Sequence, residues 1–171
     1  EFPYDHQRGS VGLEARSSVI EFNANKYYGI SDWRAGENST DEKALGGHDI
    51  EVGFALPYMP GAKLYHKQFQ WDAENGVADL EGKTTALAIN GDVFIPGLGL
   101  EIGATDFETG NDIDFAKLTF RYPPPTTTSK LFSDVAYEYS SMKDHRLDKV
   151  RRENKIVKQK GKGGGFSVVY L

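Results

Sequence analysis

The chain has 171 residues, carries a net charge of −5, and is 39% hydrophobic. No stretch approaches the ~18 consecutive apolar residues of a membrane helix, which excludes a helical membrane protein but leaves a membrane β-barrel open. Since cysteine is absent, a disulfide framework and thiol catalysis are also excluded. The chain begins at Glu1 without a methionine or a signal peptide, so we expect it to be processed or excised from something longer.

A cationic segment near the C-terminus contrasts with an acidic remainder. Residues Lys143–Lys162 contain nine Lys and Arg against three acids, so this segment carries +6 and the remainder carries −11. Such an asymmetry usually means that the two parts meet each other, or that the basic part meets an outside polyanion. The stretch Met142–Lys158, MKDHRLDKVRRENKIVK, is therefore the first place to look for function.

Period-two alternation of apolar and polar residues predicts seven β-strands of roughly eight to thirteen residues. The predicted strands are Gly9–Arg16, Val19–Ile30, His48–Pro57, Ala62–Asp72, Lys83–Phe94, Leu98–Thr105 and Asp112–Tyr122. Their connections alternate between short ones (16–18, 57–61, 95–97) and longer polar ones (31–47, 73–82, 108–111). Tight turns at one end and longer loops at the other are typical of an antiparallel up-and-down outer-membrane barrel.

The two faces of the predicted strands differ in chemistry. One face is aliphatic and aromatic, and the other is Gly, Ala, Asn, Thr, Asp and Glu. A soluble sandwich turns its large apolar residues inward, whereas a membrane barrel turns them toward lipid, and periodicity alone does not distinguish the two. Small residues on the polar face fit a crowded lumen, and aromatic residues near strand ends fit interfacial girdles, so we favour the barrel. These aromatic residues are Tyr27, Tyr28, Trp33, Tyr58, Phe94 and Tyr122.

The barrel interpretation assigns each face a set of residues. We expect Glu51 and Glu101 to lie inside, and Phe54, Leu87 and Ile102 to lie outside. The predicted lipid-facing residues are Ile20, Phe22, Val52, Phe54, Leu87, Ile89, Leu100, Ile102, Leu118 and Phe120. The predicted acidic lumen lining is Glu14, Glu21, Asp49, Glu51, Asp92, Glu101 and Asp114.

The remainder of the chain divides into three further parts after the strands of residues 1–122. Pro123-Pro124-Pro125 ends the sheet, because proline has no donor for a ladder, and opens a Pro/Thr-rich connector over 123–141. A cationic linker follows over 142–160. A flexible glycine-rich tail occupies 161–171 and ends in a short β-prone run, Phe166–Leu171.

Candidate catalytic and metal sites are weak in this sequence. It contains no P-loop, dinucleotide fingerprint or nucleophile elbow, so we expect no cofactor and no enzymatic activity. Glu101 and Asp106 could imitate a hydrolase pair, although a solvated lumen lining is favoured. Neither the histidines nor the loop acids show the spacing of a metal site, and we expect the acids to be solvated. These residues are His6, His48, His66 and His145, and Asp41, Glu42, Asp72, Glu74, Asp79, Glu81, Glu108 and Asp112.

The cationic linker has several possible partners. A nucleic-acid site would interleave aromatics with the charges, and Met142–Gln159 contains none. A membrane-surface helix would need a clear apolar face, and Leu147, Val150 and Ile156 are too few. The remaining interpretation is that the linker lies in the acidic lumen. The residues assigned to it are Arg146, Asp148, Val150, Arg151, Arg152, Asn154, Lys155 and Ile156.

The chain resembles the inverse autotransporters, the intimin and invasin family of Gram-negative outer-membrane adhesins. Val11–Trp33 is similar to the family's hairpin that ends in a YxxxSxW-like sequence, and Gly47–Pro57 with Lys63–Gln68 is similar to the next hairpin. The most specific match is Arg146–Val157, which resembles the family's post-barrel pattern Asp-x-Val-x-Arg-x-Asn-x-Ile-Val. The matching positions are Asp148, Val150, Arg152, Asn154, Ile156 and Val157.

The resemblance implies a barrel of roughly twelve strands, of which seven are predicted here, and a linker that runs back through the pore. It further implies type V secretion of a C-terminal passenger that adheres to host or bacterial surface receptors, and insertion by periplasmic chaperones and the barrel-assembly machinery. The implied location is the Gram-negative outer membrane, in contact with its lipid. The alternative is a soluble β-barrel or sandwich that binds a small apolar ligand on an inward-facing apolar side, with the basic segment as a solvated appendage.

Overall fold

The computed structural model describes residues 6–36, 40–90, 95–124, 130–139, 141, 150–161 and 165–169. Within these residues the secondary structure is entirely β. Among them, no helix is long and apolar enough to cross a membrane. The predictions made for Asp92, Phe94, His145, Arg146 and Asp148 fall outside the described residues.

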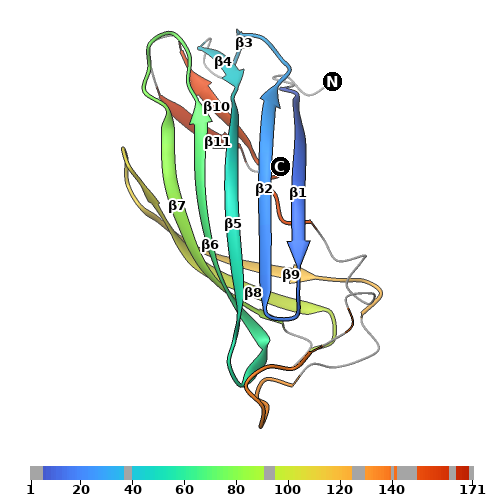
Figure 1. The fold of residues 1–171 in the computed structure, drawn as a ribbon. Helices are drawn as coiled ribbons and strands as arrows, with labels where there is room; N and C mark the ends of the chain where they lie inside the picture. The colour runs from blue at the N-terminus through green and yellow to red at the C-terminus, as the bar shows by residue number, and fades with distance from the viewer. Residues whose placement is uncertain are drawn as a thin grey trace.

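Seven long strands form one antiparallel sheet in the order β1-β2-β5-β6-β7-β8-β9. Each strand pairs with the next long strand in the chain, so the sheet is an up-and-down meander, as the sequence predicts. The sheet curls along its length, which brings β8 and β9 behind β1, β2 and β5 (Figure 1). The strands are β1 Arg8–Arg16, β2 Ile20–Gly29, β5 Gly46–Leu56, β6 Met59–Asp72, β7 Leu80–Asn90, β8 Leu98–Phe107 and β9 Ile113–Phe120.

The tight turns lie at one end of this sheet. The β1–β2 turn is closed by Ser17, whose backbone N–H donates to Ile20 O at 2.8 Å and whose hydroxyl accepts the Ile20 N–H at 2.9 Å. The β5–β6 turn is tighter than predicted, because β6 begins at Met59 and Leu56 pairs directly with Met59. Tyr58 adopts a positive φ of 61° within this turn.

A second sheet of four short strands, which we call the clasp, lies near the end that carries the long loops (Figure 1). Its order is β11-β10-β4-β3. The strands are β3 Arg34–Ala35, β4 Asp41–Ala44, β10 Ile156–Lys160 and β11 Phe166–Val169. The clasp therefore joins the β2–β5 connection to the C-terminal part of the chain.

The clasp corrects two predictions. The connection 31–47 is not a plain polar loop, because it contains β3 and β4. The tail 161–171 is not simply flexible, because Phe166–Val169 pairs with β10 as the β-prone composition of this run suggests. Strands of two to five residues are too short to show alternation, and β4 finds its partner in β10, more than a hundred residues away.

The faces of the seven-stranded sheet are inverted relative to a soluble protein. We call the face with Glu51 and Glu101 the inner face and the face with Phe54 and Ile102 the outer face. Glu51 is only 7% exposed, whereas Phe54 and Ile102 are 48% and 42% exposed. A compact apolar cluster exists only where the inner face meets the clasp, in the part of the chain that the structure describes. It comprises Tyr27, Leu45, Trp71, Leu80 and Val157.

Candidate functional site

The inner face is a network of buried charges that neutralise one another. Glu21 on β2 receives Lys63 Nζ from β6 and the hydroxyl of Tyr65, which donates to it at 2.8 Å. Tyr65 lies flat against the sheet because its cross-strand partner is Gly53, where a Cβ would collide with the Tyr65 ring. At the β1 edge, Glu14 pairs with Arg16 at 2.8 Å. The cations of the network come from the barrel wall as well as from the linker.

The linker crosses this face and inserts one arginine into it. Arg151 Nε donates to Glu51 Oε1 at 2.6 Å, and its Nη2 donates to Glu101 Oε1 at 3.0 Å. The guanidinium also lies 3.7 Å from the centroid of the Tyr65 ring. One side chain of the linker therefore joins carboxylates from β5 and β8, two strands that are not neighbours in the sheet.

The linker backbone is held as well as its side chains. The N–H of Glu153 donates to Tyr27 Oη at 2.7 Å, and its carbonyl accepts from Arg8 Nη2 at 2.6 Å. The hydroxyl of Tyr27 donates in turn to Asp49 Oδ2 at 2.6 Å. Asn25 donates to the carbonyl of Arg151 at 3.3 Å. Contacts to main-chain groups hold the linker against the wall, but every residue carries such groups, so these bonds do not by themselves select which residue lies at this point.

The Glu153 side chain adds an ion pair of the opposite polarity. Its carboxylate accepts from Lys67 Nζ of β6 at 3.2 Å. The linker therefore offers a cation to two acids of the wall, and an acid to a lysine of the wall. This mixed pattern is more specific than a positive segment in a negative channel, since each charge has one kind of partner.

The clasp holds the linker a second time. Lys158 of β10 donates to Glu42 of β4, and both side chains are largely buried. Gln159 is completely buried, and its amide forms two bonds with the backbone of Glu74: it accepts the N–H at 2.9 Å and donates to the carbonyl at 3.2 Å. The β2–β5 and β6–β7 connections are thus both attached to β10.

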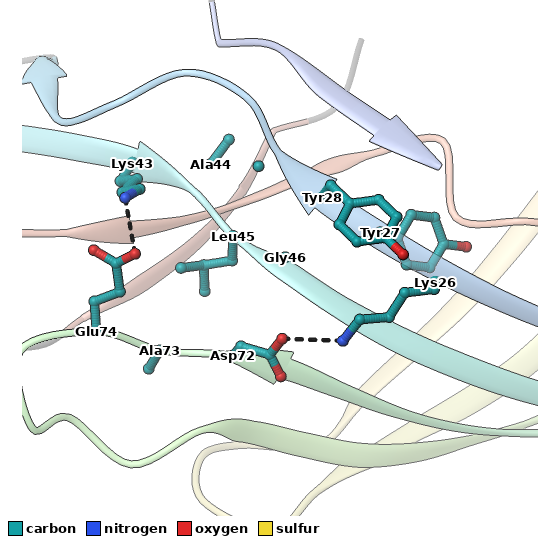
Figure 2. A pocket seen from close by; sticks show the side chains of 11 residues that line it. Lys26, Tyr27, Tyr28, Lys43, Ala44, Leu45, Gly46, Asp72, Ala73 and Glu74 are labelled. Carbon is teal, nitrogen blue, oxygen red and sulfur yellow. Dashed lines mark hydrogen bonds and ion pairs between the residues drawn. The ribbon is translucent and has the colours of Figure 1, made fainter. Parts of the chain in front are cut away.

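Exposed ion pairs surround a small cavity of about 280 Å³ beside the clasp (Figure 2). Lys43 Nζ donates to Glu74 Oε1 at 2.8 Å, and Lys26 Nζ donates to Asp72 Oδ2 at 3.3 Å. The Glu74 carboxylate raises the pKa of Lys43 above its ordinary value. The Lys43–Glu74 pair connects β4 of the clasp to the β6–β7 connection, whereas the Lys26–Asp72 pair joins the ends of β2 and β6 within the wall.

A larger cavity of about 1340 Å³ lies between the linker and the part of the inner face formed by β7, β8 and β9. Its lining includes Thr84, Lys117 and Thr119 from the wall, and Arg151 and Asn154 from the linker. The linker thus contacts one side of the curved wall closely and leaves a space on the other side, which both polar and apolar residues line.

Comparison with known proteins identifies this arrangement. The family model of the inverse autotransporter β-domain matches residues 1–154. The chain belongs to the inverse autotransporter β-domain family. Membership supports an outer-membrane translocator role rather than an enzymatic one, and it agrees with the resemblance found in the sequence. No curated protein matches the chain.

A solved structure shares the fold of this inverse autotransporter domain. The match has a TM-score of 0.71 at 19% identity and covers 90% of this chain and 67% of the other. That structure is described as "Unveiling the Mechanism Behind the in-meso Crystallization of Membrane Proteins". At this identity the likeness concerns the fold alone.

The inverse autotransporter domain places the ten predicted lipid-facing residues on one face. The register pairs Phe22 with Val52, Leu87 with Ile102, and Leu100 with Leu118, and strand alternation puts the other members beside them. Glu51 and Glu101 lie on the opposite face, where Arg151 joins them. Of the acids assigned to the lumen, Glu14, Glu21 and Asp49 also lie on this inner face.

Three residues lie elsewhere than predicted. Asp114 pairs with Ala104 and therefore lies on the outer face, close to the β8–β9 connection. Tyr27 is not part of an aromatic girdle, because it turns inward and is 1% exposed. Glu42 is not a solvated loop acid, because it is buried against Lys158 in the clasp. Alternation itself places Asp114 with Leu118 and Phe120, and Tyr27 with Glu21, so these two residues were assigned against the parity of their strands. Glu42 was misplaced because β4 is short and its partner β10 is distant in the sequence.

Sequence reasoning missed the cations of the inner face. Lys63 and Lys67 share the parity of Tyr65 on β6, and this was the least regular strand in the sequence. Their shared parity was the available signal, because side chains that lie two residues before and after Tyr65 on a strand point to the same face as Tyr65. The acid Glu153 within the cationic linker is the complementary feature, since it receives Lys67.

No candidate catalytic or metal centre is assembled in the described residues. Glu101 and Asp106 lie on opposite faces of β8, so they do not form a carboxylate pair. Among the residues that the structure describes, no group of three His, Asp or Glu could hold a metal ion.

Proposed function

We propose that this domain spans the Gram-negative outer membrane as a β-barrel, holds the linker in its pore, and exports and tethers a C-terminal passenger for adhesion or invasion. The observation that supports this most is the position of the linker. It lies on a buried polar face whose reverse side is apolar and exposed. This is the arrangement expected when lipid surrounds the wall and a hydrated lumen contains the linker.

The soluble alternative requires the opposite arrangement. A ligand-binding sandwich would bury Phe54, Leu64 and Ile102, and all three are more than 40% exposed. It would also leave Glu51 and Asp49 in water, and both are less than 10% exposed. The inverted burial therefore favours lipid as the partner of the outer face.

The proposal requires a closed wall. In the described residues β1 and β9 are the edges of the seven-stranded sheet, and each of them is hydrogen-bonded to a neighbouring strand on one side only. Unpaired backbone groups are not tolerated within a bilayer, so further strands have to join these edges in the membrane. Assembly by chaperones and the barrel-assembly machinery, and a surface receptor for the passenger, belong to the same proposal.

Spin-label accessibility tests the orientation of the faces directly. Single cysteines are introduced at Leu87, Ala88, Glu101 and Ile102 in protein refolded in lipid, and the native chain has no cysteine to interfere. We expect high oxygen and low nickel accessibility at Leu87 and Ile102, and the reverse at Ala88 and Glu101. If Leu87 and Ile102 are shielded from both reagents, the apolar face is a closed core and the translocator proposal is wrong.

A further inference from the structure

The linker presents two different sides to its surroundings. Arg151 and Glu153 point toward the described wall and bond with it, whereas Val150, Arg152 and Asn154 are exposed. The exposed positions are the ones whose pattern resembles the family's post-barrel sequence. The arginine that binds this wall is therefore not the arginine of that pattern.

The contact made by Arg151 is unusually complete. Besides the two bonds given above, Nη2 donates to Glu51 Oε2 at 3.2 Å and Nη1 donates to Glu101 Oε2 at 3.2 Å. Two carboxylates and one aromatic ring thus surround a single guanidinium. The planar fork of arginine matches this geometry, whereas the point charge of a lysine does not.

This site also distinguishes one position of the linker from its neighbours. A slip by one residue would turn the opposite side of the extended segment to the wall. A slip by two residues would bring Glu153 or Lys149 to the two carboxylates. Glu153 would be repelled by the carboxylates of Glu51 and Glu101. The ammonium group of Lys149 lacks the planar fork with which a guanidinium bridges both carboxylates.

We propose that Arg151 is the positioning residue that stops the linker at one register in the pore, and that Glu51 and Glu101 are its receiving site. This inference rests on the proposed translocator function. Arg151 engages β5 and β8 together, so it fastens the linker across four strands of the wall. Arg152, whose side chain donates to Asn154 of the linker itself, does not contribute to this stop.

Conductance in planar bilayers tests the proposal on the intact protein. A linker that is no longer fixed leaves the pore more often, so Arg151→Gln is expected to raise the mean conductance several-fold. Arg152→Gln is the matched control, since it removes the same charge one residue away, and its conductance is expected to equal the wild-type value. Arg151→Lys is expected to fall between the two, because it keeps the charge but loses the fork.

A double-mutant cycle separates the stop from a general loss of charge. Once Arg151→Gln is present, adding Glu101→Gln is expected to change conductance little, although Glu101→Gln alone raises it. Additive effects, or equal effects of Arg151→Gln and Arg152→Gln, would overturn the assignment. If Arg151→Gln does not fold, as judged by heat-modifiable gel mobility, Glu101→Gln still decides, because it retains Arg151 and its bonds to Glu51.

The two proposals fail in different ways. If another residue sets the register, the wild-type protein still forms a channel, and Arg151→Gln does not change its conductance. A wrong translocator function gives the shielded pattern of spin labels at Leu87 and Ile102, whatever the conductance of the variants.

Discussion

Neighbouring tyrosines on β2 illustrate how differently the two faces of this wall are built. Tyr27 is 1% exposed and bonds to Asp49 and to the linker, whereas Tyr28 is 54% exposed on the outer face. The same contrast extends along the strand, where buried Glu21, Asn23 and Asn25 alternate with the outward Ile20 and Phe22. Two neighbouring residues of the same strand therefore differ in kind: one makes a specific polar contact on the inner face, and the next makes a nonspecific apolar contact on the outer face.

The difference shows which face carries information. The outer face needs only to be apolar, because a bilayer has no fixed groups to recognise, and many aliphatic residues satisfy it. The inner face needs particular partners at particular distances, because a buried charge without a partner is costly. Substitutions of similar size should therefore have different consequences on the two faces.

A charge on the outer face is expected to give the largest effect. Ile102 lies near the middle of β8, so Ile102→Arg places a charge close to the bilayer midplane and should lower the free energy of unfolding by about 2–4 kcal/mol. Thr119→Arg, on the inner face and beside the large cavity, should change it by less than about 0.5 kcal/mol. Urea unfolding in lipid vesicles measures both, and equal losses would contradict the assignment of the faces.

The tyrosine pair gives the next largest effect. Tyr27→Phe removes a donor to Asp49 and the acceptor of the Glu153 N–H, which should cost about 1–3 kcal/mol. Tyr28→Phe removes a hydroxyl from the exposed face and should be nearly neutral. Urea unfolding gives the two costs, and hydrogen exchange at Glu153 should accelerate only in Tyr27→Phe. If both variants exchange alike, Tyr27 does not hold the linker.

Much of the wall was predictable because alternation is strong wherever one face is apolar. Residues Ile20–Asn25 of β2 and Leu98–Thr105 of β8 show it without interruption, and the faces of these strands follow directly. β6 was harder, because Lys63 and Lys67 interrupt its polar–apolar contrast while sharing the inward parity of Tyr65. The sequence cannot show that these lysines are balanced by Glu21 and Glu153, since the partners lie on other segments.

The site was predictable in kind but not in detail. An excess of positive charge placed the linker against acids, yet it did not distinguish Arg151 from Arg152. That choice depends on which side of an extended segment meets the wall, and on two acids that only the curl of the sheet brings together. The clasp was missed for a related reason, because β4 and β10 are short and their pairing is wholly nonlocal.

The smallest expected effect lies at the rim of the clasp, where both partners are partly hydrated. The Lys43 side chain is 19% exposed and Glu74 is 44% exposed, so Lys43→Met should lower the free energy of unfolding of the clasp by about 0.2–1 kcal/mol. Lys26→Met, which removes the more exposed pair with Asp72, should cost less still. Hydrogen exchange of β4 amides measures the effect of Lys43→Met, and exchange of the β2 amides near Lys26 measures that of Lys26→Met.

The pH dependence of the Lys43 contribution has a definite sign. Since the folded pKa is raised, the contribution is complete below the unfolded value of about 10.4 and is lost as pH rises through the folded value. The difference between wild type and Lys43→Met should therefore be constant from neutral pH to about pH 10. A difference that vanishes near neutral pH would show that Glu74 does not hold Lys43, which would leave β4 held by its pairing with β10 and β3.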